Sequence, residues 1–68
     1  MQPLLTTRAA AEMLCLNSRT LERLRVAGNG PRFVKMGKSI RYRPADVEAW
    51  LMTRVIGSTS EADDLDAA

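Results

Sequence analysis

The chain has 68 residues and a mass of 7.5 kDa, which is enough for one small domain. It contains no His and a single Cys, which excludes a Ser–His or Cys–His catalytic pair, an internal disulfide and a zinc site built on imidazole. No apolar run is long enough to span a membrane, and the N-terminus does not have the pattern of a signal peptide. We therefore expect a cytoplasmic, non-enzymatic protein without catalytic residues, metal or cofactor.

The charges are divided unevenly along this chain. All 10 Lys and Arg residues lie at or before Arg54, together with four of the 8 Asp and Glu residues, so this part carries a net charge of +6. The residues after Arg54 hold the other four acidic residues and no cation, which gives −4. A strongly basic body attracts polyanions. We predict a folded basic domain over residues 1–55 and an acidic, disordered tail over residues 56–68.

The first predicted helix begins near Thr6 or Thr7, because either hydroxyl can accept a hydrogen bond from a free amide of the first turn. Ala10 and Ala11 lie one turn before Leu14 on the same face of this helix. Their small side chains allow another helix to approach closely. This helix is therefore expected to pack through its alanine face.

The second predicted helix begins at Asn17, with Ser18 as the alternative cap, and ends at Gly28, which readily adopts the left-handed conformation of a helix end. Leu21 and Leu24 are three residues apart and form its buried stripe, which ends at either Arg25 or Val26. Two short helices joined by a short turn are typical of a helix-turn-helix.

A β-hairpin is predicted after the second helix, with strands over residues 32–36 and 39–43 around a Gly-Lys turn. In the second strand Ile40 and Tyr42 should face the core, while the alternate positions carry arginines that should face outward. An isolated two-stranded ribbon is barely stable, so the hairpin must lean on the helices.

A third helix is predicted from Pro44, a residue type favoured at the first helical position, with Asp46 in the first turn, where it complements the helix dipole. Val47, Trp50 and Leu51 follow at helical spacing and form an apolar stripe, and Trp50 should anchor this helix over the first one. The large side chains expected in the core or at its rim are Met13, Phe33, Met36, Tyr42 and Trp50.

Two groups of motifs resemble a known family. The first group is Leu5-Thr6-Thr7, Ala10-Ala11, Leu14 and Leu16-Asn17-Ser18-Arg19-Thr20-Leu21. The second group is Gly30-Pro31, Met36-Gly37-Lys38, Ile40-Arg41-Tyr42-Arg43-Pro44, Asp46-Val47 and Ala49-Trp50-Leu51. Together they resemble the excisionase and AlpA type of the MerR-like winged helix-turn-helix family. Two positions depart from that family: an acidic residue is common where this chain has Ala9, and Gly is common at Cys15.

The resemblance implies a mainly α fold with a small β-hairpin wing, in which residues 1–55 form a winged helix-turn-helix DNA-binding domain. Such proteins are small DNA-binding factors of phages and integrative elements that direct recombination towards excision, regulate transcription, or do both. The implied partners are double-stranded DNA, a site-specific integrase or recombinase, and further copies assembled cooperatively on DNA. Because the long dimerising helix of MerR-type regulators is not seen in the sequence, we expect a monomer in the absence of DNA.

The candidate DNA-binding residues lie on the second helix and the hairpin. Arg19 and Arg23 are four residues apart, so they project from one side of the helix and can reach base edges in the major groove. Cations of the hairpin can reach phosphates or the minor groove, although lysines there would also suit a solvated edge that resists aggregation. The full set is Ser18, Arg19, Thr20, Arg23, Arg25, Lys35, Lys38 and Arg41.

Alternatives stay open at this point. The same residues suit a purely transcriptional activator or repressor. They also suit a protein-interaction module that binds an integrase or a repressor with little affinity for DNA. The face on which Arg25 lies is ambiguous, and Arg43 suits a helix cap as well as a DNA contact. The acidic tail suits a solubilising segment or, through Ala67-Ala68, a degradation signal.

Overall fold

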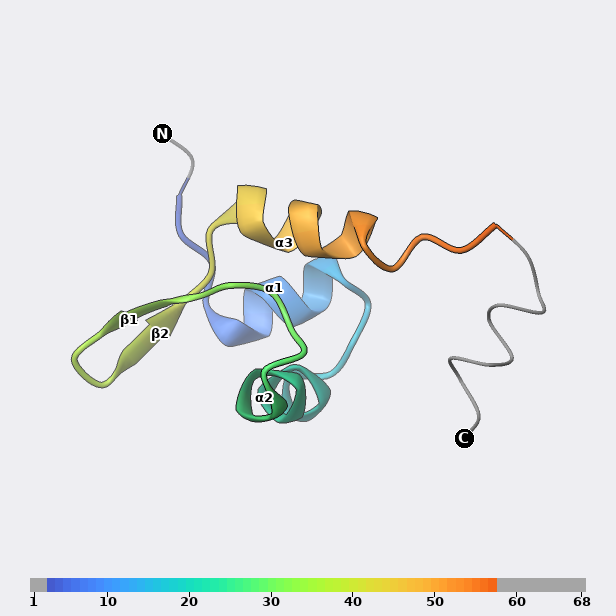
Figure 1. Ribbon diagram of the computed structural model, residues 1–68. Helices are drawn as coiled ribbons and strands as arrows, with labels where there is room; N and C mark the ends of the chain where they lie inside the picture. The colour runs from blue at the N-terminus through green and yellow to red at the C-terminus, as the bar shows by residue number, and fades with distance from the viewer. Residues whose placement is uncertain (1–2, 58–68) are drawn as a thin grey trace.

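Three helices and one hairpin make up the fold of the computed structural model, which describes residues 3–57 (Figure 1). The elements are α1 (Thr7–Met13), α2 (Ser18–Ala27), β1 (Val34–Met36), β2 (Ser39–Arg41) and α3 (Pro44–Met52). In Figure 1 α1 crosses the middle of the molecule, with α3 above it, α2 below it and the hairpin extending to the left. This confirms the predicted mainly α class with a β wing. Nearly all of the predicted tail, residues 58–68, lies outside the described residues.

Side-chain caps set the starts of the first two helices. The Ala9 amide donates to Thr6 Oγ1 at 3.1 Å, and the Thr20 amide donates to Asn17 Oδ1 at 2.8 Å. Each bond satisfies an amide that has no partner inside its own helix. Of the predicted alternatives, Thr6 and Asn17 are therefore the caps. Gly28 ends α2 at φ 77°, in the left-handed conformation that the sequence predicts.

The turn between α1 and α2 contains the one non-glycine residue with positive φ among the described residues. Cys15 has φ 57°, and its side chain is exposed. A side chain in this region brings Cβ close to the following carbonyl oxygen, which costs about 1–2 kcal/mol. The helix-turn-helix thus requires a left-handed residue at the position where the family resemblance leads us to expect glycine.

The core consists of five fully buried side chains from four parts of the chain. They are Ala10, Ala11, Leu21, Tyr42 and Val47. Because the two alanines carry only methyl groups, Leu21 from α2 and Val47 from α3 can pack close to the backbone of α1. The alanine face of α1 is therefore the surface against which α2 and α3 pack. Packing through this face is what the sequence predicts.

Tyr42 ties the base of the hairpin to the rest of the fold. Its backbone pairs with Leu5 through two hydrogen bonds of 2.7 Å, and its ring lies 6.2 Å from that of Phe33. Its hydroxyl accepts a hydrogen bond from Arg25 at 3.3 Å, so the buried phenol has a polar partner. The predicted second strand ends earlier than expected because Tyr42 pairs with the N-terminal segment instead of with β1.

The start of α3 is held by a double hydrogen bond between side chains. Pro44 occupies the first helical position, and the guanidinium of Arg43 donates to both carboxylate oxygens of Asp46, one of these bonds being 3.0 Å long. This hydrogen-bonded partner holds the pKa of the Asp46 carboxyl below its usual value and raises the pKa of Arg43. Of the two roles considered for Arg43, the structure shows the one at the helix start.

The far half of α3 is attached to the loop that follows α2. Trp50 is half-buried, and its Nε1–H donates to the carbonyl oxygen of Asn29 at 2.8 Å. Arg54 donates to the same oxygen at 2.8 Å, and its guanidinium carbon lies 5.1 Å from the centre of the Trp50 ring. The sequence predicts that Trp50 anchors α3 over α1; the hydrogen bond of its indole connects α3 to the loop after α2.

Several predicted core residues are exposed instead. Met13, Met36 and Leu51 expose 54%, 48% and 47% of their surface, and Phe33 lies at the rim of the core against Tyr42. The physical reason is the small size of the domain. Its helices and strands are short, so they bury only five side chains completely and leave further large residues partly exposed to solvent. Within residues 3–57, no helix has the length and apolar character needed to cross a membrane.

Replacing Cys15 with glycine should stabilise the domain. The left-handed strain at this position is relieved, and it outweighs the greater freedom of glycine in the unfolded chain, so the expected gain is about 1 kcal/mol or less. Thermal unfolding followed by circular dichroism should show Tm raised by several degrees. Cys15→Ala removes the thiol but keeps Cβ, so its Tm should stay near that of the wild type; an equal gain from both variants would contradict this explanation.

The pair between Arg43 and Asp46 should make stability depend on pH in the acid range. Because the carboxyl has a lower pKa in the folded chain than its unfolded value of about 3.9, the pair stabilises the fold above that pH. This stabilisation is lost as the pH falls through the lowered folded-state pKa. Asp46→Asn should therefore lower Tm at about pH 6, and the difference from wild type should shrink towards about pH 2. A difference that does not change with pH would mean that the charge of Asp46 has no part in it.

Candidate nucleic-acid interface

The solvent side of α2 carries a continuous row of side chains at helical spacing, here called the α2 outer stripe. Its members line a shallow hollow of about 320 Å³ and are Arg19, Glu22, Arg23, Val26 and Ala27. Leu21, on the opposite side of the helix, is fully buried against α1. Burial of that face fixes the rotation of α2 about its axis, so the α2 outer stripe faces solvent.

Arg19 and Arg23 are the two cations of the α2 outer stripe, and both are exposed. Neither guanidinium has an ion pair or a hydrogen bond within the described residues, so both charges are available to an external anion. Ser18 and Thr20 flank them and are half-buried, and the Thr20 amide is already used by the Asn17 cap. The structure thus brings the four predicted residues of the first turns together at one end of α2.

Arg25 differs from the other predicted residues of α2. It is half-buried, and its NH1 group donates to Thr7 Oγ1 at 3.2 Å and to the Tyr42 hydroxyl at 3.3 Å. Its guanidinium carbon also lies 5.8 Å from the centre of the Phe33 ring. These contacts join α2 to the start of α1 and to the base of the hairpin. The remaining N–H groups of the guanidinium have no partner within the described residues.

The hairpin presents its cations on two faces. Lys35 pairs with Ile40, and Val34 pairs with Arg41. Directly opposite residues of an antiparallel pair share a face, and neighbours along a strand do not, so Lys35 and Arg41 lie on opposite faces of the ribbon. Lys38 lies in the turn; it and Lys35 are exposed, while Arg41 is half-buried and donates to the Ile40 carbonyl at 2.8 Å. The expected inward face of Ile40 and Tyr42 is confirmed, since Tyr42 is buried and Ile40 packs against the core, but the cations of the whole hairpin lie on both of its faces.

The relative placement of α2 and the hairpin can be followed in Figure 1. In that view α2 lies below α1, on the side away from α3, and the hairpin extends to the left, with its turn lower than the start of α3. The hydrogen bonds of Arg25 and the pairing of Tyr42 with Leu5 connect these two elements to the same core. The two groups of predicted DNA-binding residues thus lie on elements that are attached to the same core.

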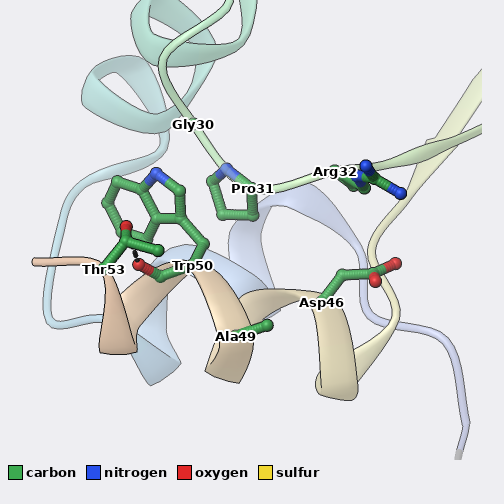
Figure 2. Close-up of a pocket in the computed structure, with 7 residues that line it drawn as sticks. All are labelled: Gly30, Pro31, Arg32, Asp46, Ala49, Trp50 and Thr53. Carbon is green, nitrogen blue, oxygen red and sulfur yellow. Dashed lines mark hydrogen bonds between the residues drawn. The ribbon is translucent and has the colours of Figure 1, made fainter.

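A second hollow, of about 390 Å³, lies on the other side of the molecule between α3 and the loop after α2. Figure 2 shows the loop residues of this hollow facing those of α3, with Trp50 at one end and Asp46 near the other. Asp46 is already engaged by Arg43, and the indole N–H of Trp50 is engaged by Asn29. Among residues 3–57, no three Cys, Asp or Glu side chains are placed to hold a metal ion.

Sequence reasoning did not place Val26 on the surface that carries the two arginines. It left open whether Val26 or Arg25 ends the buried stripe of the second helix. In the structure Val26 belongs to the α2 outer stripe and Arg25 faces inward. The available signal is the spacing, since Val26 lies seven residues after Arg19 and three after Arg23, on the same helical face.

The sequence was also compared with known protein families and proteins. A family model described as a helix-turn-helix domain matches residues 4–55, a range that contains all three helices and both strands. The comparison with curated proteins finds no match. The matched range contains the α2 outer stripe and the hairpin cations described above. From this match and the observed order of elements, the chain belongs to the helix-turn-helix domain family.

Proposed function

We propose that the chain binds duplex DNA in a sequence-specific manner, with α2 in the major groove and the β1–β2 wing on the backbone or in the minor groove. The observation that carries this proposal is that Arg19 and Arg23 are exposed and have no counter-ion within the described residues. Both lie on one face of a rotationally fixed helix. Unpaired arginines at helical spacing suit an anionic, groove-shaped ligand.

The first turns of α2 supply the base contacts in this proposal. A recognition helix places its N-terminal residues nearest the base edges. Arg19 or Arg23 can form paired hydrogen bonds with O6 and N7 of guanine, and each such pair contributes about 1–3 kcal/mol of discrimination. Thr20 can contact a thymine methyl, and Ser18, at the start of the helix, can contact a phosphate.

The wing supplies contacts to the backbone. With Lys35 and Arg41 on opposite faces of the ribbon and Lys38 at its tip, the hairpin can place one cation towards each of the two strands that border a groove. Such contacts position the protein but carry little sequence information. Arg25 has a different part: it joins α2 to the hairpin base and can still donate its remaining N–H groups to a phosphate.

The biological role that we propose is that of an excisionase-like recombination directionality factor, a transcriptional regulator, or both, in a phage or integrative element. The motif resemblance to excisionase and AlpA-type proteins supports this finer assignment, and the helix-turn-helix match supports its DNA-binding part. Residues 1–55 form the DNA-binding domain in this proposal, with residues 56–68 as an acidic tail. The chain would be a monomer until copies meet on DNA, with an integrase as a further partner.

A protein-interaction module is the second candidate, because exposed apolar side chains gather at the end of α3. Leu51, Met52 and Val55 are all exposed there, away from the α2 outer stripe. A module of this kind would bind an integrase or a repressor through these residues and would have little affinity for DNA. Binding to duplex DNA therefore separates the two candidates directly.

Binding to duplex DNA should weaken steeply as salt is added. Six cations are proposed to meet the DNA, and about five of them are expected to neutralise a phosphate. They are Arg19, Arg23, Arg25, Lys35, Lys38 and Arg41. Each phosphate neutralised contributes about −0.9 to the slope of log K against log salt, so a slope of roughly −4 to −5 is expected. Gel shifts on random-sequence duplexes over a salt series measure it. A slope near zero would rule out a DNA-binding role for these cations and favour the interaction module.

Arg19→Ala and Lys38→Ala should weaken binding in different ways. Loss of a base contact should cost about 1–3 kcal/mol on the preferred sequence and relax the preference at one base pair. Loss of a phosphate contact should weaken all sequences equally and reduce the salt slope by about 1. Selection from a randomised duplex pool, followed by affinity measurements, distinguishes the two effects. Glu48→Ala, on the exposed surface of α3, serves as the control and should change neither. Equal losses with unchanged preference for both variants would contradict the division of roles.

A further inference from the structure

Val26 is unusually exposed for a large apolar side chain of this protein. It exposes 87% of its surface, more than any other large hydrophobic residue in the described part of the chain. Its place is also unusual, since it lies within α2 and not at a chain end. A single exposed valine needs no explanation by itself. Here, however, it shares a hollow with Arg19 and Arg23, so its surroundings suit a ligand with both apolar and anionic groups.

The spacing along α2 gives the geometry of such a contact. Arg19, Glu22, Arg23 and Val26 occupy positions i, i+3, i+4 and i+7. A helix that lies along the major groove presents base-reading side chains at this same set of positions. Seven helical residues advance by ~10.5 Å, which corresponds to roughly two to three base-pair steps when the helix follows the groove. The α2 outer stripe is therefore long enough to contact bases beyond those that lie nearest the N-terminus of α2.

We propose that Val26 is a specificity-determining residue that packs against the 5-methyl group of a thymine, about two to three base pairs from the base contacted by Arg19. The inference rests on the proposed function and extends it. Thymine is the one standard DNA base with a methyl group in the major groove, so it is the apolar feature that a valine can recognise there. Recognition then involves guanine at one end of the stripe and thymine at the other.

Charge complementarity selects duplex DNA over an apolar protein surface as the occupant of the hollow. Covering Val26 also brings Arg19 and Arg23 into the interface, and these cations have no counter-ion within the described residues. An apolar protein partner would have to desolvate both charges without compensation. Duplex DNA offers a methyl group for Val26, guanine acceptors and phosphates for the two arginines, and a cytosine N4 amino group that can donate to Glu22, all within one groove.

The experiment uses the full chain and the duplex site selected by the wild type from a randomised pool. Each thymine of that site is replaced in turn by deoxyuridine, which lacks only the 5-methyl group. One replacement should weaken wild-type binding roughly fourfold, the effect expected for one buried methyl group. For Val26→Ala the same replacement should change affinity by less than about twofold, because the two losses share one contact.

Val55→Ala is the matched control. It makes the same chemical change at a residue that exposes 69% of its surface beyond the end of α3. This variant should retain the wild-type discrimination between thymine and deoxyuridine. Val26→Ala should keep a Tm at least equal to that of the wild type, since no buried surface is lost and alanine is the better helix former. A folding defect is thereby separated from loss of a contact.

The outcomes separate this inference from the proposed function. If no thymine in the site is sensitive to deoxyuridine, or if Val26→Ala keeps the wild-type sensitivity, the role of Val26 is overturned while DNA binding by Arg19 stands. If Val26→Ala leaves DNA binding unchanged but abolishes binding to an integrase, the hollow belongs to a protein partner and the inference is also overturned. If the pool yields no preferred duplex and binding does not depend on salt, the proposed function fails as well.

Discussion

The burial of Tyr42 is the constraint on which the arrangement of the domain depends. A phenol can be fully buried at little cost only if its hydroxyl has a hydrogen-bond partner, and Arg25 supplies one from α2. The backbone of Tyr42 pairs at the same time with Leu5, and its ring contacts Phe33. One residue therefore fixes the hairpin, the N-terminal segment and the second helix to a common core. Any function that needs the hairpin and α2 to act together depends on this junction.

The basic residues divide according to whether the fold itself uses them. Three guanidinium groups hold parts of the structure together. Arg43 is paired with Asp46, and Arg54 contacts the Asn29 carbonyl and the Trp50 ring. Arg25 donates hydrogen bonds to Thr7 and Tyr42. The cations that remain without a partner in the described part of α2 and the hairpin are Arg19, Arg23, Lys35 and Lys38. Apart from Arg32, which lies in the loop near Asp46, the charge available for an external polyanion is thus concentrated on the two elements that a winged helix-turn-helix uses for DNA. This separation supports the proposed function more strongly than net charge does.

Packing explains why some expectations from the sequence were wrong. Helical spacing correctly placed Leu21 and Val47 in the core, but the same rule also assigned Leu51, which is half exposed. A pattern shows which face of a helix is apolar, whereas the extent of burial depends on how much of that face a neighbour covers. Short strands leave Met36 near the hairpin turn without a neighbouring layer. Similarly, alternation along one strand could not show that Lys35 and Arg41 lie on different faces, because that depends on the register between two strands.

The sequence by itself determined the features that arise within a few residues. These are the starts of α1 and α2, each limited to two adjacent capping residues, the left-handed end of α2 at Gly28, the start of α3 at Pro44 and the order of helices and hairpin. Only the tertiary structure decided that Arg25 faces inward to Tyr42, whereas Val26, the next residue, faces solvent beside Arg19. The reason is that caps and turns satisfy backbone groups locally, while the rotation of a helix is settled by the distant side chains against which it packs.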